Sequence, residues 1–281
     1  MSRVRVIGRG LLFCLGAILV LCAPSSFPDE AGQRLLFGIR AQVTLDGVPI
    51  GGWLPPEVSA LLRQRYRLER AMPTDARLQV GSGKVIPARR GLEIDVARTL
   101  ERVVRARPGE AVSSALIPID PAFTERDIAR ITRNIGDYHT WVWGSEERLH
   151  NVALAARRLD HSLVMPGELF SFNEVVGPRT AAEGYKPAPV LVGQGTAMDA
   201  GGGVCQVAST LFNAVLAARL EVVERHPHSR PVEYVPKGRD ATVLYDSLDF
   251  KFRNNTDEAI IIRSHVQGRN LTIRILAPDT P

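Results

Sequence analysis

The residue best suited to covalent chemistry is Cys205, which follows a run of three glycines closely. Glycine loses more backbone entropy on ordering than any other residue, so a glycine triplet is disfavoured inside a helix or strand. Gly201–Gly203 therefore predicts a tight loop, with Cys205 in the first turn of a following helix. The reactive form of cysteine is the thiolate, and a helix N-terminus favours negative charge. Bare N–H groups there could also stabilise an oxyanion, so Gly202, Gly203 and Gln206 are candidate substrate contacts.

The helix after the loop is predicted from the spacing of its apolar residues. They recur every three or four positions, as expected for one buried stripe: Val204, Val207, Ala208, Leu211, Val215 and Ala218. Cys205, Gln206, Ser209 and Asn213 fall on the other side. We therefore expect Cys205 to lie off the core face. The alternative is that Cys205 is simply a small buried apolar residue, as unpaired cysteines often are.

A cysteine nucleophile needs a general base, and the downstream candidates are His226 and His228. Pro227 favours an extended backbone at His226, and alternate residues of an extended segment share a face. Both imidazoles could therefore point the same way. Asp240 could orient the histidine as a third member of the site, or it could cap a turn. The alternative for the histidine pair is a hydrogen-bonded turn after a helix.

Two further candidates lie in a glycine- and proline-containing stretch that is predicted to be a loop. They are Arg179 and Tyr185, with Gly177-Pro178 and Gly184 around them. A guanidinium in such a loop could bind a substrate carboxylate through two parallel hydrogen bonds. Arg179 and Tyr185 are therefore candidate substrate-binding residues.

The sequence gives weaker evidence for a metal or cofactor site than for a reactive cysteine. Cys205, His226 and His228 are chemically suitable zinc ligands, but the paired spacing that is typical of structural zinc sites is missing. Gly201–Gly203 lacks the Lys-Ser/Thr that completes a phosphate-binding loop. We expect neither a metal nor a cofactor, and zinc stays an alternative.

The N-terminus has the layout of an export signal or membrane anchor. Three arginines precede residue 10, and an apolar run follows at Leu11–Ala23, which is short for a membrane span of ~20 residues. Cys14 and Cys22 fall inside this run, so the exported part would hold the single cysteine Cys205. An unpaired thiol in an oxidising compartment is a liability unless it is used. The location is therefore expected to be extracytoplasmic, in the cell wall or at the membrane.

The composition is that of a folded protein, with 45% hydrophobic and 23% charged residues among 281. The net charge of +5 suits an anionic envelope, and no basic run is interleaved with aromatic residues, so nucleic acid is not an expected partner. We predict an α+β chain: a signal or anchor plus linker at 1–34, a small domain at 35–123, and a second at 124–281.

Within these domains, local signals predict individual elements. Asp46-Gly47 indicates a tight turn, and Asp95 is expected to cap a helix over 96–107. In the second domain, helices are predicted over 125–135 and 148–159, a strand over 139–143, and a last strand over 271–276. These elements must bring the histidines and Asp240 to the glycine loop.

Five segments of the second domain stand in the order found in the VanW family. They are Pro166–Asn173, Val176–Thr180, Gly203–Val207, Glu224–Ser229 and Gly238–Val243. The chain thus resembles the VanW family over about residues 137–276. The first domain resembles a peptidoglycan-binding domain that often precedes it, through Asp46-Gly47 and the Gly91–Asp95 step into a helix.

The resemblance implies a cell-envelope protein, since in some VanW members the domain looks like an L,D-transpeptidase that uses the motif cysteine. It implies that Cys205 attacks the carbonyl between stem residues three and four of peptidoglycan, releases D-Ala, and passes the acyl group to a neighbouring stem. His228 is the preferred base, because the family motif is most recognisable at its His-Ser step. The expected partners are stem peptides, glycan strands, and the membrane if the N-terminal segment is not cleaved. The alternatives are a non-catalytic wall-binding or glycopeptide-resistance accessory protein and a zinc-dependent wall hydrolase.

Overall fold

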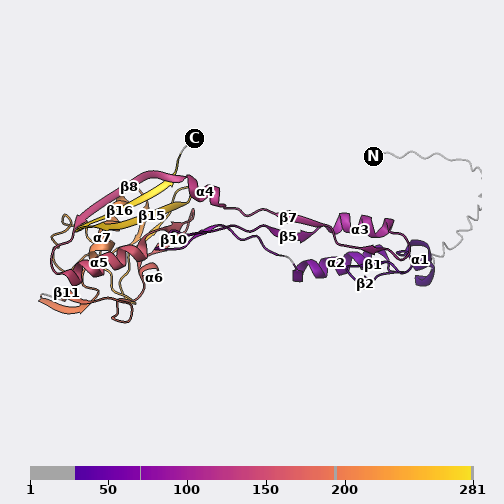
Figure 1. The fold of residues 1–281 in the computed structure, drawn as a ribbon, viewed down its shortest axis with the longest axis horizontal. Coiled ribbons are helices and arrows are strands. Elements are labelled where there is room, and N and C mark those ends of the chain that lie inside the picture. The colour runs from indigo at the N-terminus through magenta and orange to yellow at the C-terminus, as the bar shows by residue number, and fades with distance from the viewer. Residues whose placement is uncertain (1–28, 70, 193–194, 280–281) are drawn as a thin grey trace, which may run out of the picture. The chain divides into compact units, whose positions relative to one another are not determined.

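The computed structural model describes residues 29–279 except 70, 193 and 194 (Figure 1). The predicted signal or anchor lies outside these residues. Among the described residues, no helix has both the length and the apolar character to cross a membrane. The chain is α+β, as predicted from the sequence. Its described residues form two units, one up to Leu68 with Ile94–Ala115, and one of Glu69–Glu93 with the chain from Leu116 onward. The boundary at 123/124 stays a prediction, and residues 69–93 group with the second unit.

The first unit is a small layered structure of helices and short strands. Its helices are α1 (Glu30–Phe37), α2 (Pro55–Glu69) and α3 (Val96–Arg105), and its strands β1 (Thr44–Leu45), β2 (Val48–Pro49) and β6 (Ala111–Val112) form a sheet in the order β2-β1-β6. Asp46 and Gly47 have φ of 46° and 81°, so the predicted turn is confirmed. Asp95 caps α3 as expected, because its Oδ1 accepts from the Arg98 amide at 2.8 Å.

The start of this unit differs from the prediction. Helix α1 begins at Glu30, inside the segment expected to be a linker up to residue 34. Asp29 caps the helix by accepting from the Gly32 amide at 2.8 Å. Arg34 then joins Glu30 to Glu57 at the start of α2, at 2.9 and 2.7 Å. A cap and an ion-pair bridge stabilise a helix that the short polar sequence alone did not indicate.

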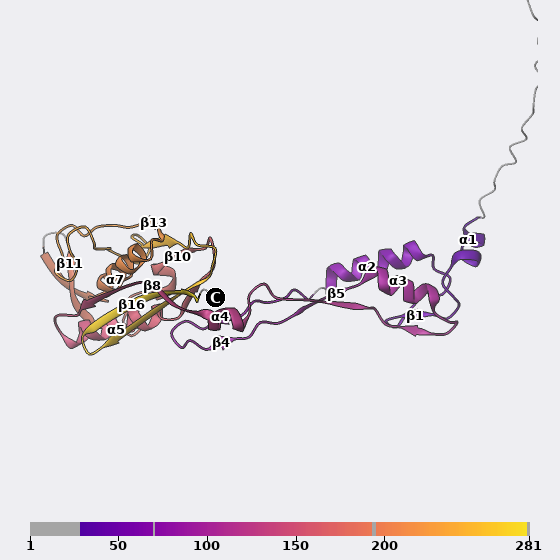
Figure 2. The ribbon, with the colours of Figure 1, turned by 90° about the horizontal axis from the view of Figure 1, so that it is seen from above.

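The second unit is built on an antiparallel sheet in the order β8-β16-β15-β9. Its strands are β8 (Ile131–Trp141), β9 (Ser162–Val164), β15 (Ile260–Gln267) and β16 (Asn270–Pro278). Helices α5 (Glu146–Leu159) and α7 (Val204–Ala217) pack against the sheet and against each other (Figures 1 and 2). The main core lies between these layers, around Phe172, Leu211 and Ile273.

The predicted helix over 125–135 is wrong in its second half. Helix α4 ends at Arg130, and β8 begins at Ile131. Thr124 and Asp127 form a capping box, which accounts for the helical start. From Ile131 onward the chain pairs with β16 along most of its length, and these tertiary hydrogen bonds outweigh local helix preference.

Shorter elements complete the second unit. A second sheet has the order β10-β14-β13, from β10 (Leu169–Ser171), β13 (Glu221–Glu224) and β14 (Lys251–Arg253), with the short helix α6 (Phe172–Val176) after β10. Strands β11 (Pro187–Val192) and β12 (Gly195–Ala200) form a hairpin that leads directly into the glycine loop.

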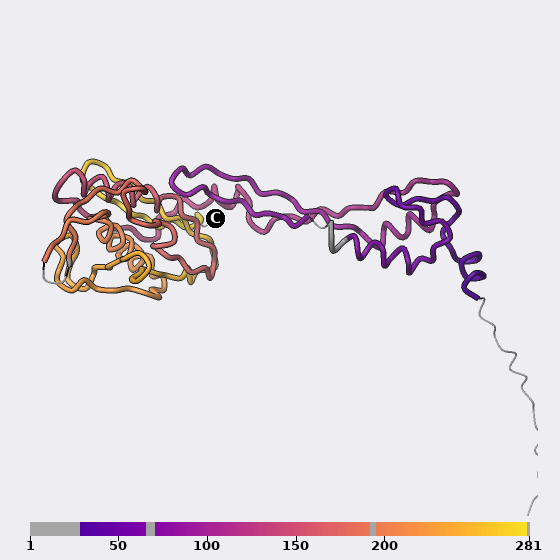
Figure 3. Tube along the Cα trace, turned by 90° about the horizontal axis from the view of Figure 1, so that it is seen from below, coloured from indigo at the N-terminus to yellow at the C-terminus, as the bar shows by residue number. Residues whose placement is uncertain are grey.

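Residues 69–93 contribute β3 (Arg77–Leu78), β4 (Val85–Ile86) and most of β5 (Gly91–Ile94), which pairs with β7 (Leu116–Ile119). The β3–β4 hairpin runs close to the body of the second unit in the Cα trace (Figure 3). Ala76 is buried in a separate apolar cluster with Ile128, Ile131, Ala259 and Ile261. The Gly81 amide donates to the Asp160 carbonyl at 2.7 Å.

Helix α7 is buried more completely than its pattern indicated. Gln206, Ser209 and Asn213, expected on an outer polar face, are buried with exposed fractions of 3% or less. Ser209 and Asn213 donate to the carbonyls of Cys205 and Ser209, at 2.8 and 2.7 Å. Since these side chains bond to the preceding turn of their own helix, α7 can be buried on all sides without leaving polar groups unpaired.

Candidate active site

The glycine loop turns the chain sharply into α7 and is clamped from α5. Gly203 caps the helix with φ of 111°, which an L-residue rarely adopts. A Cβ on Gly202 would lie 2.5 Å from the Ala188 carbonyl oxygen, so only glycine allows this approach. The buried Asn151 amide donates to the carbonyls of Gly202 and Lys186, at 3.1 and 2.8 Å. The loop is therefore a fixed element of the site.

Cys205 occupies the first turn of α7, as predicted from the loop–helix pattern. It was expected off the core face, but it is partly buried and packs against the main core cluster. Its Sγ lies 3.5 Å from the Val243 carbonyl oxygen and within hydrogen-bonding reach of His228. Among the described residues, the amide N–H groups of Gly203 and Cys205 have no hydrogen-bond acceptor. These two donors beside the thiol are suited to an oxyanion formed on an attacked carbonyl.

His228 and Asp240 lie behind the thiol in an ordered chain. The Asp240 Oδ2 atom accepts from both the His228 amide and His228 Nδ1, each at 2.7 Å. The His228 side chain is only 7% exposed. Because Nδ1 is committed to Asp240, Nε2 is the nitrogen that can exchange a proton with Cys205. The structure thus brings Cys205, His228 and Asp240 together.

The three groups stabilise one another's charged forms. Burial alone would raise the pKa of Cys205, but the His228 imidazole and the Arg179 charge outweigh it, so the pKa of the thiol is lowered. Burial would likewise lower the pKa of His228, yet Cys205 and Asp240 raise it. The pKa of Asp240 is lowered, because hydrogen bonds from His228 overcome the penalty of burial. This arrangement favours the thiolate–imidazolium form of the pair.

Arg225 and Tyr234 complete this chain, and sequence reasoning missed both. Arg225 donates to the Asp240 carbonyl at 2.6 Å and to its Oδ1 at 2.9 Å, and its guanidinium stacks over Phe212. The Tyr234 hydroxyl lies 3.4 Å from His228 Nε2. Burial raises the pKa of Tyr234, so the phenol stays neutral beside the imidazole. Arg225 directly precedes the histidine pair, and that adjacency was the available signal.

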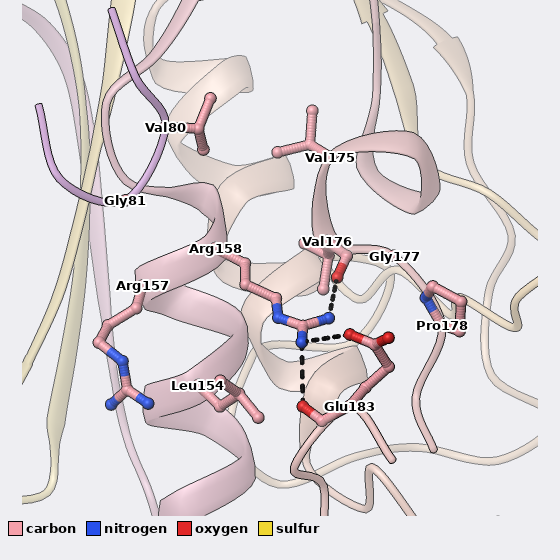
Figure 4. A pocket seen from close by; sticks show the side chains of 10 residues that line it. All are labelled: Val80, Gly81, Leu154, Arg157, Arg158, Val175, Val176, Gly177, Pro178 and Glu183. Atoms are coloured by element: carbon pink, nitrogen blue, oxygen red, sulfur yellow. Dashed lines mark hydrogen bonds and ion pairs between the residues drawn. The ribbon is translucent and has the colours of Figure 1, made fainter. Parts of the chain in front are cut away.

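Arg179 and Tyr185 sit where the sequence placed them, in the loop after α6. Arg158 ties this loop to α5: it donates to the Val176 carbonyl at 3.0 Å and to the Glu183 carboxylate at 2.6 Å (Figure 4). Its guanidinium also stacks on the Tyr185 ring. Figure 4 shows the bonds of Arg158 to Val176 and Glu183 among the residues that line a cavity. This cavity has a volume of about 510 Å³, and Cys205 is not among its lining residues. The loop is therefore held in place by Arg158 of α5.

Two predicted site residues have other roles. The Gln206 amide is 1% exposed and is fully used, because it donates to Thr140 and to the Trp141 carbonyl and accepts from Arg148 at 3.0 Å. It supports the start of α7. His226 Nε2 contacts Glu224 at 2.9 Å and not the thiol, so the two imidazoles have different partners.

The three residues considered as zinc ligands do not form a metal-binding group. Within the described part of the chain, no three His, Cys, Asp or Glu side chains are grouped so as to hold a metal ion. His226 is paired with Glu224, and His228 Nδ1 with Asp240. His226 and His228 thus face different acidic partners.

A family model described as "VanW like protein" matches residues 147–276. The chain belongs to the VanW family. The matched VanW segment contains Cys205, His228, Asp240, Arg179 and Tyr185, so the whole candidate site lies inside it.

Two relatives extend this comparison. The uncharacterized protein YoaR of Bacillus subtilis (strain 168) is 40% identical over 202 residues, which cover 70% of this chain and 67% of YoaR. The vancomycin B-type resistance protein VanW of Enterococcus faecalis (strain ATCC 700802 / V583) is 33% identical over 117 residues, or 40% of this chain and 42% of that protein. No solved structure gives a significant match.

Proposed function

We propose that this protein is a cysteine acyltransferase of the cell wall that works as an L,D-transpeptidase. The observation that carries the proposal is the alignment of Cys205, His228 and Asp240, with the Asp240 carboxylate at 2.7 Å from His228 Nδ1. A polarised thiol, an oriented imidazole and free amide donors are the parts that acyl transfer requires.

The proposed reaction has two steps. The Cys205 thiolate attacks the carbonyl between stem residues three and four, and the imidazolium of His228 gives its Nε2 proton to the departing D-Ala amine. The Gly203 and Cys205 amides bind the oxyanion as the thioester forms. The side-chain amine of residue three on a second stem then attacks the thioester, His228 takes the amine proton, and a 3–3 cross-link and the resting thiolate–imidazolium pair result. Water as acceptor would make the enzyme a carboxypeptidase.

The cellular setting is part of the proposal. The name of the Enterococcus relative links that protein to vancomycin resistance, which concerns the cell wall. We infer that this chain acts outside the cytoplasmic membrane on peptidoglycan. The resemblance of residues 35–123 to a peptidoglycan-binding domain supports a role for them in binding glycan strands. A non-catalytic wall-binding protein is the alternative outcome.

The test is the intact mass of the purified protein after incubation with a stem tetrapeptide. We expect an adduct equal to the tetrapeptide minus D-Ala, located on Cys205 by peptide mapping. Cys205→Ser should abolish the adduct, while His226→Ala, which changes a histidine with another partner, should keep it. A folded wild-type protein that never acquires the adduct, yet binds isolated cell walls, would support the accessory role instead.

A further inference from the structure

The guanidinium of Arg179 is buried without a hydrogen-bond partner. Its Nε, Nη1 and Nη2 atoms are all shielded from solvent, and none donates to an acceptor in the described structure. The Tyr185 hydroxyl is buried and unpaired in the same way, and the two residues interact electrostatically. Buried polar groups are nearly always satisfied, and an unpaired buried charge is especially costly. Such a group indicates a binding site for an acceptor from outside the chain.

The surroundings of Arg179 hold the guanidinium in one orientation. Its Cζ atom lies 5.5 Å from the centre of the Phe172 ring and 5.7 Å from that of Tyr245. Its stem packs on Gly201, where a Cβ would come within 2.7 Å of the Arg179 Cβ. The fork of N–H donors is therefore pre-organised before any ligand binds.

None of the carboxylates in the described part of the chain takes up these donors. Asp249 interacts electrostatically with Arg179, but its Oδ2 accepts from Ser171 at 2.5 Å and its Oδ1 from the Asn173 amide at 3.0 Å. Tyr245, whose ring lies over the guanidinium, is 38% exposed, so this side of Arg179 borders the protein surface. An anion from outside is the partner that fits five unpaired donors and one phenol.

The position of Arg179 relative to the thiol limits what this anion can be. The Arg179 charge acts on Cys205 directly and favours the thiolate. Arg179 also packs on Gly201, in the loop that leads into Cys205, so a ligand held by Arg179 lies next to the loop that carries the attacking thiol. In the proposed reaction, the acyl donor has one carboxylate close to the scissile carbonyl, which is the free C-terminus of the leaving residue.

We propose that Arg179, with Tyr185, binds the free α-carboxylate of the residue that leaves, so that only peptides ending one residue beyond the scissile carbonyl are acyl donors. This inference rests on the proposed function for its substrate, but its anion site stands on geometry. Longer peptides and C-terminal amides would be rejected, because they leave the buried guanidinium unpaired. Arg179 thus acts as a specificity residue for a C-terminal carboxylate.

The first test uses two alkylating reagents of similar size, iodoacetate and iodoacetamide. Both give a thioether on Cys205 and release iodide, but only iodoacetate carries a carboxylate. Both reagents react with the same thiolate, so the ratio of their two rates on one protein does not depend on the thiol pKa. We expect Arg179→Gln to lower the iodoacetate-to-iodoacetamide ratio by about 10-fold or more, the usual worth of a charge-assisted hydrogen bond. Arg179→Lys keeps the charge, should fold more readily, and should recover only part of the ratio.

The control is Arg148→Gln. Arg148 also acts electrostatically on Cys205, but its Nη2 is committed to Gln206 at 3.0 Å. An equal loss in the Arg148 and Arg179 variants would mean a general field effect and would overturn the anion site. An unchanged ratio in folded Arg179→Gln and Arg179→Lys would overturn it as well.

The second test compares a stem tetrapeptide with its C-terminal amide as donor to the wild-type protein. We expect the acyl adduct from the free acid and at least about 10-fold slower formation from the amide. Equal rates would overturn the specificity role. If neither peptide acylates Cys205 but the reagent ratio still depends on Arg179, the proposed function fails while the anion site stands.

Discussion

Arg225 binds Asp240 at two points: its Nε donates to the Asp240 backbone carbonyl at 2.6 Å, and its Nη2 donates to the Asp240 Oδ1 atom at 2.9 Å. The second carboxylate oxygen is left for His228, which meets it with both its amide and its ring. The direction of the carboxylate is therefore fixed by a residue outside the reacting groups. The orientation of the His228 imidazole therefore depends on Arg225, through Asp240.

Asp240→Asn should weaken the thiolate without disturbing the fold. In the wild type, Cys205 and Asp240 raise the pKa of His228 and His228 lowers that of Cys205. Without the Asp240 charge, the pKa of His228 falls, and the less protonated imidazole lowers the pKa of Cys205 by less. The thiolate–imidazolium pair, which exists between these two pKa values, is then populated over a narrower pH range. We expect acylation to slow by about 10²–10⁴-fold and the pH midpoint of iodoacetamide alkylation to move upward. If Asp240→Asn had the same alkylation midpoint as His226→Ala, Asp240 would not act on Cys205 through His228.

Arg225→Gln should affect the same series of hydrogen bonds, because Arg225 binds Asp240, which in turn binds His228. The variant loses the ion pair to Asp240 and the stacking over Phe212. We expect the pH midpoint of alkylation to shift upward by less than in Asp240→Asn. In the double variant the two midpoint shifts should not add up, because both changes act through the position of His228. Additive shifts would mean that Arg225 acts independently of Asp240.

Gly203→Ala tests the turn into α7. The added Cβ would meet Val152 Cγ2 at 2.9 Å, at a φ of 111°. Gly268→Ala is the matched control, since it also has positive φ (60°) but nothing within 4 Å. Strain at such positions costs about 1–3 kcal/mol, so both should lose stability in urea denaturation, Gly203→Ala by more. Only Gly203→Ala should also slow alkylation of Cys205, and a similar loss of reactivity in both would rule out a local effect.

Glu224 should make stability depend on acid pH. Its hydrogen bond with His226, helped by Lys251, holds its pKa at about 2. A depressed folded-state pKa stabilises the protein above the unfolded value of about 4.3, and this contribution is lost as the pH falls toward 2. Glu224→Gln should flatten the fall of the unfolding free energy between these values, measured by denaturant titration. The exposed Glu233→Gln should leave the curve unchanged, and a flat wild-type curve would show that the pair contributes nothing.

The sequence was sufficient for the parts of the site that follow from local backbone. Three glycines before an apolar periodicity gave the loop, the helix and the position of Cys205. The His228–Asp240 contact was among the predicted options, but choosing it over His226 required the fold. Glu224 lies two residues before His226 and forms a hydrogen bond with its ring. The local sequence does not show whether the His226 ring is paired in this way or is available to the thiol.

Other predictions failed because tertiary contacts override local preference. Gln206 was read as solvent-facing from its position opposite the apolar stripe, yet Thr140, Trp141 and Arg148 from other elements satisfy its amide. The strand from Ile131 is set by its partner β16, more than a hundred residues later in the chain. The hairpin at 187–200 was missed, and its strand carries Pro187 and Pro189, which argue against a strand unless it is an edge.

The burial of Ala76 with Ile128, Ile131, Ala259 and Ile261 affects how a minimal protein can be produced. A truncation beginning at residue 124 would remove Ala76 and the Gly81 amide that caps the Asp160 carbonyl. It would uncover an apolar patch on the edge of the VanW domain and favour aggregation. Since residues 94–115 belong to the other unit, no single cut in the chain releases the second unit intact. An active fragment would need residues 69–93 joined to 116–281 through a designed linker.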